Sequence, residues 1–335
     1  MRSLIWKVLQ FPRFKLTTLP TPLEEVKALS KELGIKLFIK RDDVMELALG
    51  GNKVRKLEFI LGDALSKGSD VLITRGAFHS NHARLTAAAA RKAGLEAYIV
   101  LTPPGTPNLQ GNVLLDALLD ARIFLADSYQ EADELMEKLA KDLKDQGRKP
   151  YIIPGGGASP IGVLGYATAA LEILQQLSER GIRPRYMVHA TGSGGTQAGL
   201  ILGLKLLGAD DVEVVGISIS RSAKEVQERV AKLVNECANL LNIDLRIEPE
   251  EVVVTDAYVG GGYGVVSREV VKTMKYVAQH EALLLDPVYT GKAMWGLIDL
   301  ARKNYFKAEG SIVFIHTGGT PIIFQLSSKI EEFIS

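Results

Sequence analysis

The sequence predicts a parallel α/β fold, and three observations lead to this expectation. Short β-rich runs alternate with helical runs along nearly all of the 335 residues, which is the order of elements that parallel sheets need. Several β-rich runs are apolar on both faces, as strands covered on both sides must be. Hydrophobic residues make up 47% of the chain, so the sheets can bury a substantial core.

The elements are expected in the following order along the chain. An irregular start, Leu19-Pro20-Thr21-Pro22, precedes the first strand. Each helical run has a polar outer face, and most segments end on glycine or in a charged loop. The expected strands are residues 37–40, 71–74, 97–101, 123–125, 151–153, 187–190, 212–217 and 311–315. The expected helices are residues 54–67, 81–93, 108–119, 130–144, 161–178, 196–207, 223–241, 265–279 and 291–304.

The composition narrows the class of function. The formal net charge is +1, so the chain has no basic field that would attract nucleic acid. The longest apolar stretches, such as 169–174 and 312–315, are too short to span a membrane, and the first residues lack the apolar core of a signal peptide. We therefore expect a soluble, cytoplasmic protein that acts on a small molecule. The single cysteine, Cys237, is expected to be a packed residue.

A tight glycine turn places Lys53 at the start of a helix. The run GGNKVRKLE occupies residues 50–58. A lysine that forms a Schiff base needs a partly neutral amine, which burial or cationic neighbours provide, and Arg55 and Lys56 lie within the next turn. Lys56 is placed to meet a phosphate as a point charge. The alternative is that these residues are ordinary exposed helix residues.

A second glycine-rich turn, TGSGGTQAG at residues 191–199, connects an apolar strand to a helix. Free backbone N–H groups at such a helix start collect phosphate, and the hydroxyls of Ser193 and Thr196 add donors. The run does not match the common nucleotide-binding motifs, and a plain strand-to-helix turn is the alternative. Together with Lys53, the turn suggests a lysine-bound cofactor that carries a phosphate.

Further polar loops follow expected strands at the sheet edge where ligands bind in open α/β folds. In FHSNH at residues 78–82, Ser80 is expected to cap a helix. The same residue can donate to a substrate carboxylate and move a proton. His79 and His82 share a helix face, but no further ligand has metal-site spacing, so no metal is expected.

Two tyrosines lie in glycine loops in the last third of the chain. Tyr263 belongs to GGGYG at residues 260–264, and Tyr289 belongs to DPVYTGK at residues 286–292. Each tyrosine either faces a ligand or is a hydrogen-bonded core residue.

These motifs, together with HTGG at residues 316–319, resemble those of the D-cysteine desulfhydrase and 1-aminocyclopropane-1-carboxylate deaminase family. The match covers almost the whole chain in family order. The resemblance implies the tryptophan synthase β-like fold, fold type II of enzymes that use pyridoxal 5′-phosphate, with two open twisted parallel-sheet domains and helices on both faces. It also implies a small domain of residues 56–161, inserted in a large cofactor-binding domain of residues 1–55 and 162–335.

Carried over residue by residue, the resemblance implies the following roles. The catalytic residues are expected to be Lys53, Ser80, Tyr263 and Tyr289. The substrate carboxylate is expected to bind at Ser80, Asn81 and His82, and Asn81 also matches the group near the phenolic oxygen of the cofactor. The cofactor is expected to contact Lys53, Lys56, Asn81, Gly192, Ser193, Gly194, Gly195, Thr196, Thr290 and Thr317.

The chain departs from the ring-opening deaminases of this family at Thr290 and Thr317, where those enzymes have a glutamate and a leucine. A carboxylate beside the pyridine nitrogen keeps it protonated and makes the ring a deep electron sink, whereas a threonine hydroxyl can only donate to a neutral nitrogen. A shallower sink favours β-elimination. The expected reaction is therefore the conversion of D-cysteine to pyruvate, hydrogen sulfide and ammonia.

Three alternatives stay open at this point. The chain can be a 1-aminocyclopropane-1-carboxylate deaminase that yields 2-oxobutyrate and ammonia, a sulfo-lyase that acts on cysteate, or a non-catalytic amino-acid-binding protein on the same scaffold. The sequence also leaves open the stereochemical preference and whether Lys53 or Ser80 takes the α-proton. The resemblance further implies a homodimer.

Overall fold

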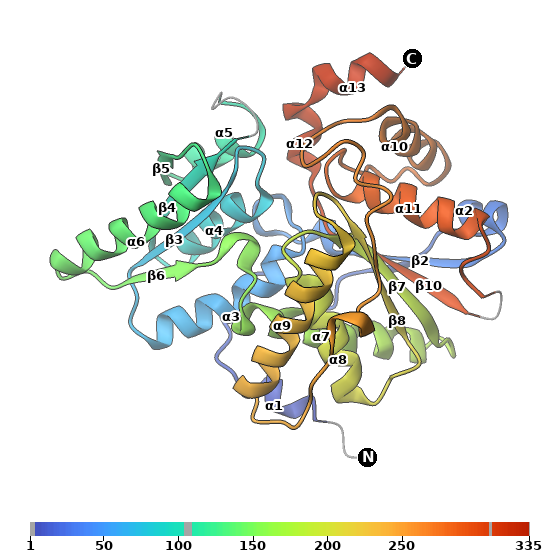
Figure 1. The fold of residues 1–335 in the computed structure, drawn as a ribbon, viewed down its shortest axis with the longest axis horizontal. Coiled ribbons are helices and arrows are strands. Elements are labelled where there is room, and N and C mark those ends of the chain that lie inside the picture. The colour runs from blue at the N-terminus through green and yellow to red at the C-terminus, as the bar shows by residue number, and fades with distance from the viewer. Residues whose placement is uncertain (1–3, 104–108, 308–309, 335) are drawn as a thin grey trace.

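Two separate sheets organise the molecule (Figure 1). The structure is a computed structural model that describes residues 4–103, 109–307 and 310–334. The larger sheet has six strands in the order β1-β2-β10-β7-β8-β9, and the smaller sheet has four strands in the order β5-β4-β3-β6. The expected fold class, α/β with two open parallel sheets covered by helices, is confirmed.

The regular elements have the following bounds. The strands are β1 Leu23–Glu25, β2 Lys36–Arg41, β3 Val71–Ala77, β4 Glu96–Thr102, β5 Arg122–Leu125, β6 Pro150–Ile153, β7 Pro184–Thr191, β8 Glu213–Ser218, β9 Val254–Thr255 and β10 Ser311–His316. The helices are α1 Trp6–Leu9, α2 Lys27–Leu33, α3 Lys53–Ser66, α4 Asn81–Lys92, α5 Gly111–Leu118, α6 Tyr129–Asp145, α7 Pro160–Ser178, α8 Gly195–Leu207, α9 Ala223–Leu240, α10 Arg268–Glu281, α11 Thr290–Arg302, α12 Thr320–Gln325 and α13 Ser327–Ile334.

Every expected strand and helix has a counterpart among these elements. The expected start of the helix 108–119 falls on residue 108, which lies outside the described residues. The sequence did not predict β1, which pairs with β2 in the antiparallel sense, or β9, which extends the other edge of the large sheet. Both strands are too short to show an alternating pattern. Cys237 is buried on α9, as expected.

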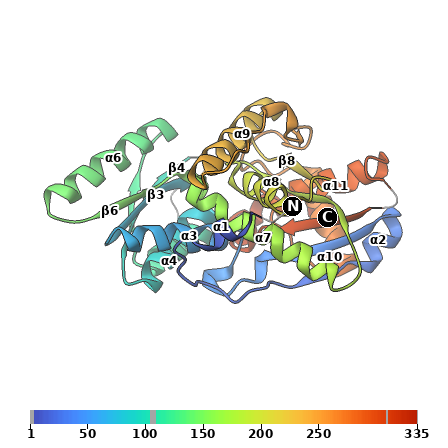
Figure 2. The same cartoon turned by 90° about the horizontal axis from the view of Figure 1, so that it is seen from below.

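The large sheet is covered on both faces, as its apolar strands require. Along β10, Ile312 and Phe314 pack in one cluster with residues of α2, α10 and α11. The alternate residues Val313 and Ile315 pack in another cluster with residues of α7 and α8. Because successive side chains of a strand point to opposite faces, these clusters lie on the two sides of the sheet, and Figure 2 shows the helices in layers around the strands.

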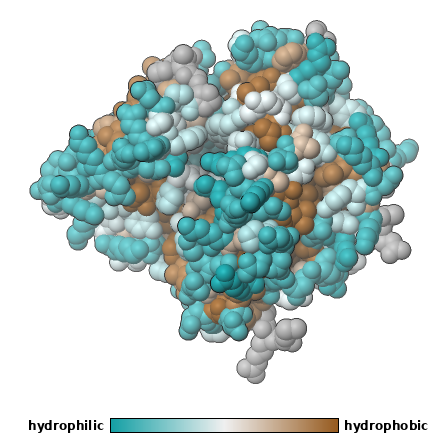
Figure 3. All heavy atoms as spheres, viewed as in Figure 1, coloured by the Kyte–Doolittle hydropathy of each residue, from teal (hydrophilic) through white to brown (hydrophobic). Residues whose placement is uncertain are grey.

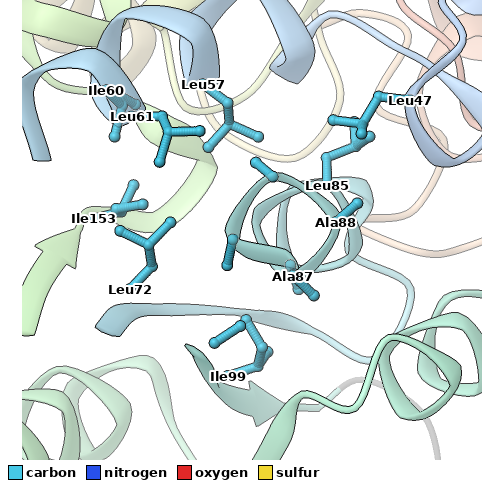
Figure 4. Close-up of a cluster of buried hydrophobic side chains, with 14 of the residues drawn as sticks. Leu47, Leu57, Ile60, Leu61, Leu72, Leu85, Ala87, Ala88, Ile99 and Ile153 are labelled. Carbon is cyan, nitrogen blue, oxygen red and sulfur yellow. The ribbon is translucent and has the colours of Figure 1, made fainter. Parts of the chain in front are cut away.

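The small sheet is built in the same way. One face packs against α6 through the apolar stripe of that helix. The other face packs against α3 and α4, and Figure 4 shows Leu57, Ile60 and Leu61 of α3 gathered near Leu72 and Ile153 of this sheet. Helix α3 therefore begins beside the large sheet and is buried along its length against the small one. We propose, on this packing, the domain bounds 1–55 with 162–335 and 56–161.

On the face drawn in Figure 3, hydrophilic residues predominate and hydrophobic residues form separate patches between them. Among the described residues, no helix is both long and apolar enough to cross a membrane. The chain passes between the two sheets twice, outward through α3 and back through the glycine turn Gly155–Gly157 that follows β6. Both passages contribute residues to the site described next.

Candidate active site

A cavity of about 500 Å³ is lined by residues of both sheets and their loops. Five helices begin at this cavity, because the residues that precede their first turns are among its lining: Asn52 before α3, Ser80 before α4, Gly194 before α8, Ser222 before α9 and Tyr289 before α11. The N-terminal end of a helix carries partial positive charge. The cavity is therefore suited to a ligand with more than one anionic group.

The turn before Lys53 can be made only by glycines. Gly50 and Gly51 have φ angles of 61° and 119°, a region that strains other residues. A Cβ on Gly50 would lie 2.6 Å from the Asp43 carbonyl oxygen, and one on Gly51 would lie 2.9 Å from that of Thr317. The turn thus holds the start of α3 against the loop after β10 and directs Lys53 into the cavity.

The amine of Lys53 is buried without a carboxylate partner in the described part of the chain. Its Nζ donates to the Gly156 carbonyl oxygen at 3.2 Å. Burial lowers the pKa of this amine from 10.5 to about 8, because desolvation disfavours the charged form. At neutral pH the neutral form is therefore far more abundant than in an ordinary lysine, and the neutral form is the one that attacks a carbonyl carbon.

Lys56 is also buried, one turn further along α3. Its Nζ lies 3.4 Å from the same Gly156 oxygen, and a Cβ on Gly195 would lie 2.9 Å from this amine. Burial, and then the charge of Lys53, lower the pKa of Lys56 well below its ordinary value. Lys56 does not line the cavity surface itself, but it places a cation directly behind the first turn of α8.

The glycine-rich turn after β7 presents free backbone donors. Gly192, Ser193, Gly194 and Thr196 line the cavity, whereas Gly195 faces Lys56 behind them. Among the described residues, the backbone N–H groups of 193–196 have no hydrogen-bond acceptor. The Thr196 hydroxyl accepts a hydrogen bond from the Asn52 side chain at 2.9 Å, which ties this turn to the start of α3. Such a set of free N–H groups binds a phosphate.

A second group of donors lies across the cavity at the start of α4. The Ser80 hydroxyl oxygen accepts from the Ala83 N–H at 3.2 Å, so its own hydrogen can point into the cavity. Within the described residues the N–H groups of Asn81 and His82 have no acceptor. The His82 Nε2 shares a hydrogen bond of 2.9 Å with the Thr74 hydroxyl. Burial lowers the pKa of His82 well below its ordinary value, so the ring is neutral.

The two glycine-loop tyrosines meet in the cavity. The hydroxyls of Tyr263 and Tyr289 lie 2.5 Å apart, and the ring of His79 stacks near that of Tyr263 with centroids 5.2 Å apart. Burial raises the pKa of both tyrosines, so both hydroxyls stay protonated. The Tyr263 loop is held by Lys292, whose buried amine donates to the carbonyl oxygens of Val259 and Gly262 at 2.6 Å each. No cluster of three metal-ligating residues occurs in the described ranges.

Of the two threonines expected at the cofactor ring, the structure brings only Thr317 to the cavity. The Thr290 hydroxyl is turned into its own loop, where it accepts from the Asp286 N–H at 2.8 Å and donates to the Asp286 carboxylate at 2.7 Å. Both bonds close the turn that precedes α11. The Thr290 side chain therefore stabilises the loop that presents Tyr289. The sequence motif alone did not reveal this role.

Three arginines that line the cavity were not predicted from the sequence. Arg75 at the end of β3 and Arg221 and Arg229 around the start of α9 line the cavity, and Arg75 lies over the Tyr129 ring at 4.8 Å. Burial and the charges of Arg221 and Arg75 lower the pKa of Arg229. The one usable signal was position, because Arg75 lies near the carboxyl end of β3 and Arg221 follows the carboxyl end of β8, where sites lie in open parallel sheets.

Comparisons with known proteins agree with this geometry. A family model described as pyridoxal-phosphate dependent enzyme matches residues 15–318. The chain is 46% identical over 327 residues to a protein of Pyrococcus abyssi provisionally named 1-aminocyclopropane-1-carboxylate deaminase, covering 97% of each chain. It is 44% identical to the D-cysteine desulfhydrase of Klebsiella pneumoniae, covering 94% of this chain and 96% of that protein.

Solved structures give the same result for the fold. A crystal structure of a homologue of 1-aminocyclopropane-1-carboxylate deaminase superposes with a TM-score of 0.92 at 42% identity, covering 99% of both chains. Threonine deaminase isoform 2 of Solanum lycopersicum superposes with a TM-score of 0.69 at 20% identity, covering 98% of this chain and 87% of that one. The second likeness concerns the fold alone.

Proposed function

The chain belongs to the family of pyridoxal-phosphate dependent enzymes, and from this premise we propose that it is a lyase acting on D-cysteine. The reaction consumes D-cysteine and water and yields pyruvate, hydrogen sulfide and ammonia. A relative with 44% identity over nearly the whole chain carries the name of this activity. The observation that carries the proposal is the buried, partly neutral amine of Lys53 at the meeting point of five helix N-termini.

The residues of the cavity fit pyridoxal 5′-phosphate. Two negative charges on a phosphate match the free N–H groups of residues 193–196 and the cation of Lys56 behind them. The amine of Lys53 is the group that would hold the aldehyde carbon, and Asn81 would lie at the phenolic oxygen. When bound, the cofactor supplies an electron-withdrawing ring that stabilises negative charge at the substrate α-carbon.

The chain's own residues then account for binding and proton transfer. The free N–H groups of Asn81 and His82, with the Ser80 hydroxyl, would hold the substrate carboxylate at the start of α4. Lys53 or Ser80 would take the α-proton, since both side chains reach the cavity. The protonated pair Tyr263 and Tyr289 would bound the leaving-group side and donate a proton to the departing sulfur.

The experiment that tests this function compares four substrates in parallel: D-cysteine, L-cysteine, cysteate and 1-aminocyclopropane-1-carboxylate. We expect pyruvate and sulfide from D-cysteine and no 2-oxobutyrate from the cyclopropane. Borohydride treatment should attach the cofactor irreversibly to Lys53. If 2-oxobutyrate is the main product, the enzyme is a ring-opening deaminase, the activity after which the Pyrococcus abyssi relative is provisionally named.

One observation favours a second candidate, the elimination of sulfite from cysteate. Arg221 and Arg229 line the cavity together with Arg75, which is paired with Asp133, whereas Glu225 is the one acidic residue in the described lining. This excess of positive charge suits a sulfonate better than a thiol. Arg229→Gln should reduce cysteate turnover while leaving D-cysteine turnover near its original rate. Equal losses with both substrates would assign Arg229 no role in substrate choice.

We also propose that the protein is a homodimer that works in the cytoplasm. The assembly is the one that the resemblance in sequence implies, and it suits an enzyme with small-molecule substrates. Light scattering coupled to size-exclusion chromatography measures the mass directly. A single species of one chain's mass, 36.4 kDa, would contradict the dimer.

A further inference from the structure

Three buried or nearly buried side chains of the small sheet's helices form a hydrogen-bonded chain that ends at the cavity. Arg84 on α4 donates through Nη1 to the Oδ1 of Asn112 on α5 at 3.2 Å. Asn112 donates through Nδ2 to the Oδ1 of Asn81 at 3.0 Å. Asn81 lines the cavity, whereas Arg84 and Asn112 lie behind it with exposures of 0%.

The direction of this chain is fixed by chemistry. A guanidinium group has only donors, so the oxygen of the Asn112 amide must face Arg84. The Asn112 nitrogen then faces the other way, and its two hydrogens go to Asn81 Oδ1 and to the His79 carbonyl oxygen at 2.9 Å. The orientation of an amide is assigned from such a network, and here every alternative assignment would set two donors or two acceptors against each other.

The orientation of the Asn112 amide also sets that of the Asn81 amide. Its oxygen is occupied by Asn112, so its amide hydrogens are the atoms left to face the ligand. We propose that Arg84 and Asn112 are positioning residues that fix Asn81 as a hydrogen-bond donor toward the phenolic oxygen of the cofactor. This inference rests on the proposed function, because the phenolic oxygen is the acceptor that it needs.

Arg84 has a second link that strengthens the case. Its Nη2 donates to the Gly50 carbonyl oxygen at 2.7 Å, in the glycine turn that directs Lys53. One guanidinium therefore orients both the amide expected at the phenolic oxygen and the turn that carries the lysine. Burial lowers the pKa of Arg84 to about 10, so the group remains charged at neutral pH and keeps its donor character.

The test is the Asn112→Asp variant of the holoenzyme, read by the absorption of the bound cofactor. The carboxylate accepts from Arg84 but has no hydrogen for Asn81, so the Asn81 amide should turn and present its oxygen to the cavity. An oxygen there favours the protonated phenol over the ionised one. We expect the ratio of the long-wavelength band to the short-wavelength band to fall about tenfold at one pH, the effect of losing one hydrogen bond to a charged group.

Asp116→Asn is the matched control, because Asp116 lies one turn further along α5 and is buried near Arg84 but makes no hydrogen bond to Asn81. It should leave the band ratio unchanged. Asn112→Ala removes both amide donors without adding charge and should shift the ratio in the same direction, so it replaces Asn112→Asp if that variant does not fold. An unchanged ratio in a folded Asn112 variant would overturn the inference. Absence of any cofactor band in the unmodified enzyme would instead overturn the proposed function.

Discussion

Helix α3 carries buried charge on two sides, and the two sides differ in how that charge is balanced. On the first side, Arg55 donates to both oxygens of Asp42 at 2.8 Å and to both oxygens of Glu172 at 2.9 Å. Lys40 also pairs with Glu172, and the Tyr166 hydroxyl donates to Asp42 at 2.5 Å. Every charge in this group has an opposite partner.

On the second side, the amines of Lys53 and Lys56 share the Gly156 carbonyl oxygen and have no carboxylate in the described part of the chain. The pKa of each amine is lowered, first by burial. Unbalanced buried charge is costly, so we infer that this side is completed by an anionic ligand. The comparison teaches that the paired side of α3 is balanced by the protein itself, whereas the unpaired side is where we propose that the cofactor binds.

The largest effect is expected where the unpaired side is broken. Lys53→Ala should reduce turnover of D-cysteine by about 10³-fold or more, because it removes both the amine that holds the cofactor and a candidate base. The visible absorption of the bound cofactor should be lost with it. Lys67→Ala is the matched control at the C-terminal end of the same helix, since Lys67 follows the last residue of α3, is exposed and pairs with Asp63; it should keep full activity. A Lys53→Ala enzyme that still turns over would contradict the assignment.

Breaking the paired side should affect stability. Arg55→Met leaves Asp42 and Glu172 buried without their main partner, and removal of one member of a buried pair costs about 3–5 kcal/mol. Urea denaturation of the apoprotein measures this loss. The exposed pair Lys67 and Asp63 provides the comparison, because its removal should cost less than about 1 kcal/mol. Similar losses at the two pairs would show that burial does not decide the difference.

A smaller effect of opposite sign is expected at Lys56. Lys56→Met removes a buried cation that has no anionic partner, so the apoprotein should become more stable in urea. Affinity for inorganic phosphate and for the cofactor should fall about tenfold, since a charged hydrogen-bond donor is lost. A variant that loses stability and keeps its phosphate affinity would mean that Lys56 stabilises the fold and does not bind the phosphate.

The smallest effect concerns pH. The pKa of Lys53 is about 8 in the folded protein against an ordinary 10.5, so the unfolded chain binds the proton more tightly between these values. The apoprotein should therefore gain stability as pH rises from 8 to 10.5. The destabilisation that comes from keeping a proton on the Lys53 amine should reach its full size below pH 8. Lys53→Met should flatten this rise in urea titrations at a series of pH values. Lys292, whose pKa is also about 8, contributes equally to both proteins.

The parts of the structure that could be predicted from the sequence are those that depend on patterns among neighbouring residues. Strands and helices follow from local periodicity, and the turns at Gly50, Gly192 and Ser80 follow from glycine and capping chemistry. The domain bounds and the catalytic roles remain proposals.

Long-range pairing was not predictable in the same way. Asn112 meets Asn81 across 31 positions and Arg55 meets Glu172 across 117, and no local pattern announces either contact. The role of the Thr290 hydroxyl in closing its own turn was not predicted either, although its partner Asp286 is only four residues away. Local patterns thus predict the elements and turns better than they predict which partner a side chain takes.

The turn Gly155–Gly157 has a further consequence for motion. It is the returning passage between the sheets, and its Gly156 carbonyl is the acceptor that Lys53 and Lys56 share. A Cβ on Gly156 would lie 2.7 Å from the Ser193 hydroxyl, so the turn also contacts the glycine-rich turn after β7. A displacement of this turn would change the hydrogen bonds of both amines together with the packing against Ser193. One short glycine segment therefore connects the two lysines of α3 to the turn after β7.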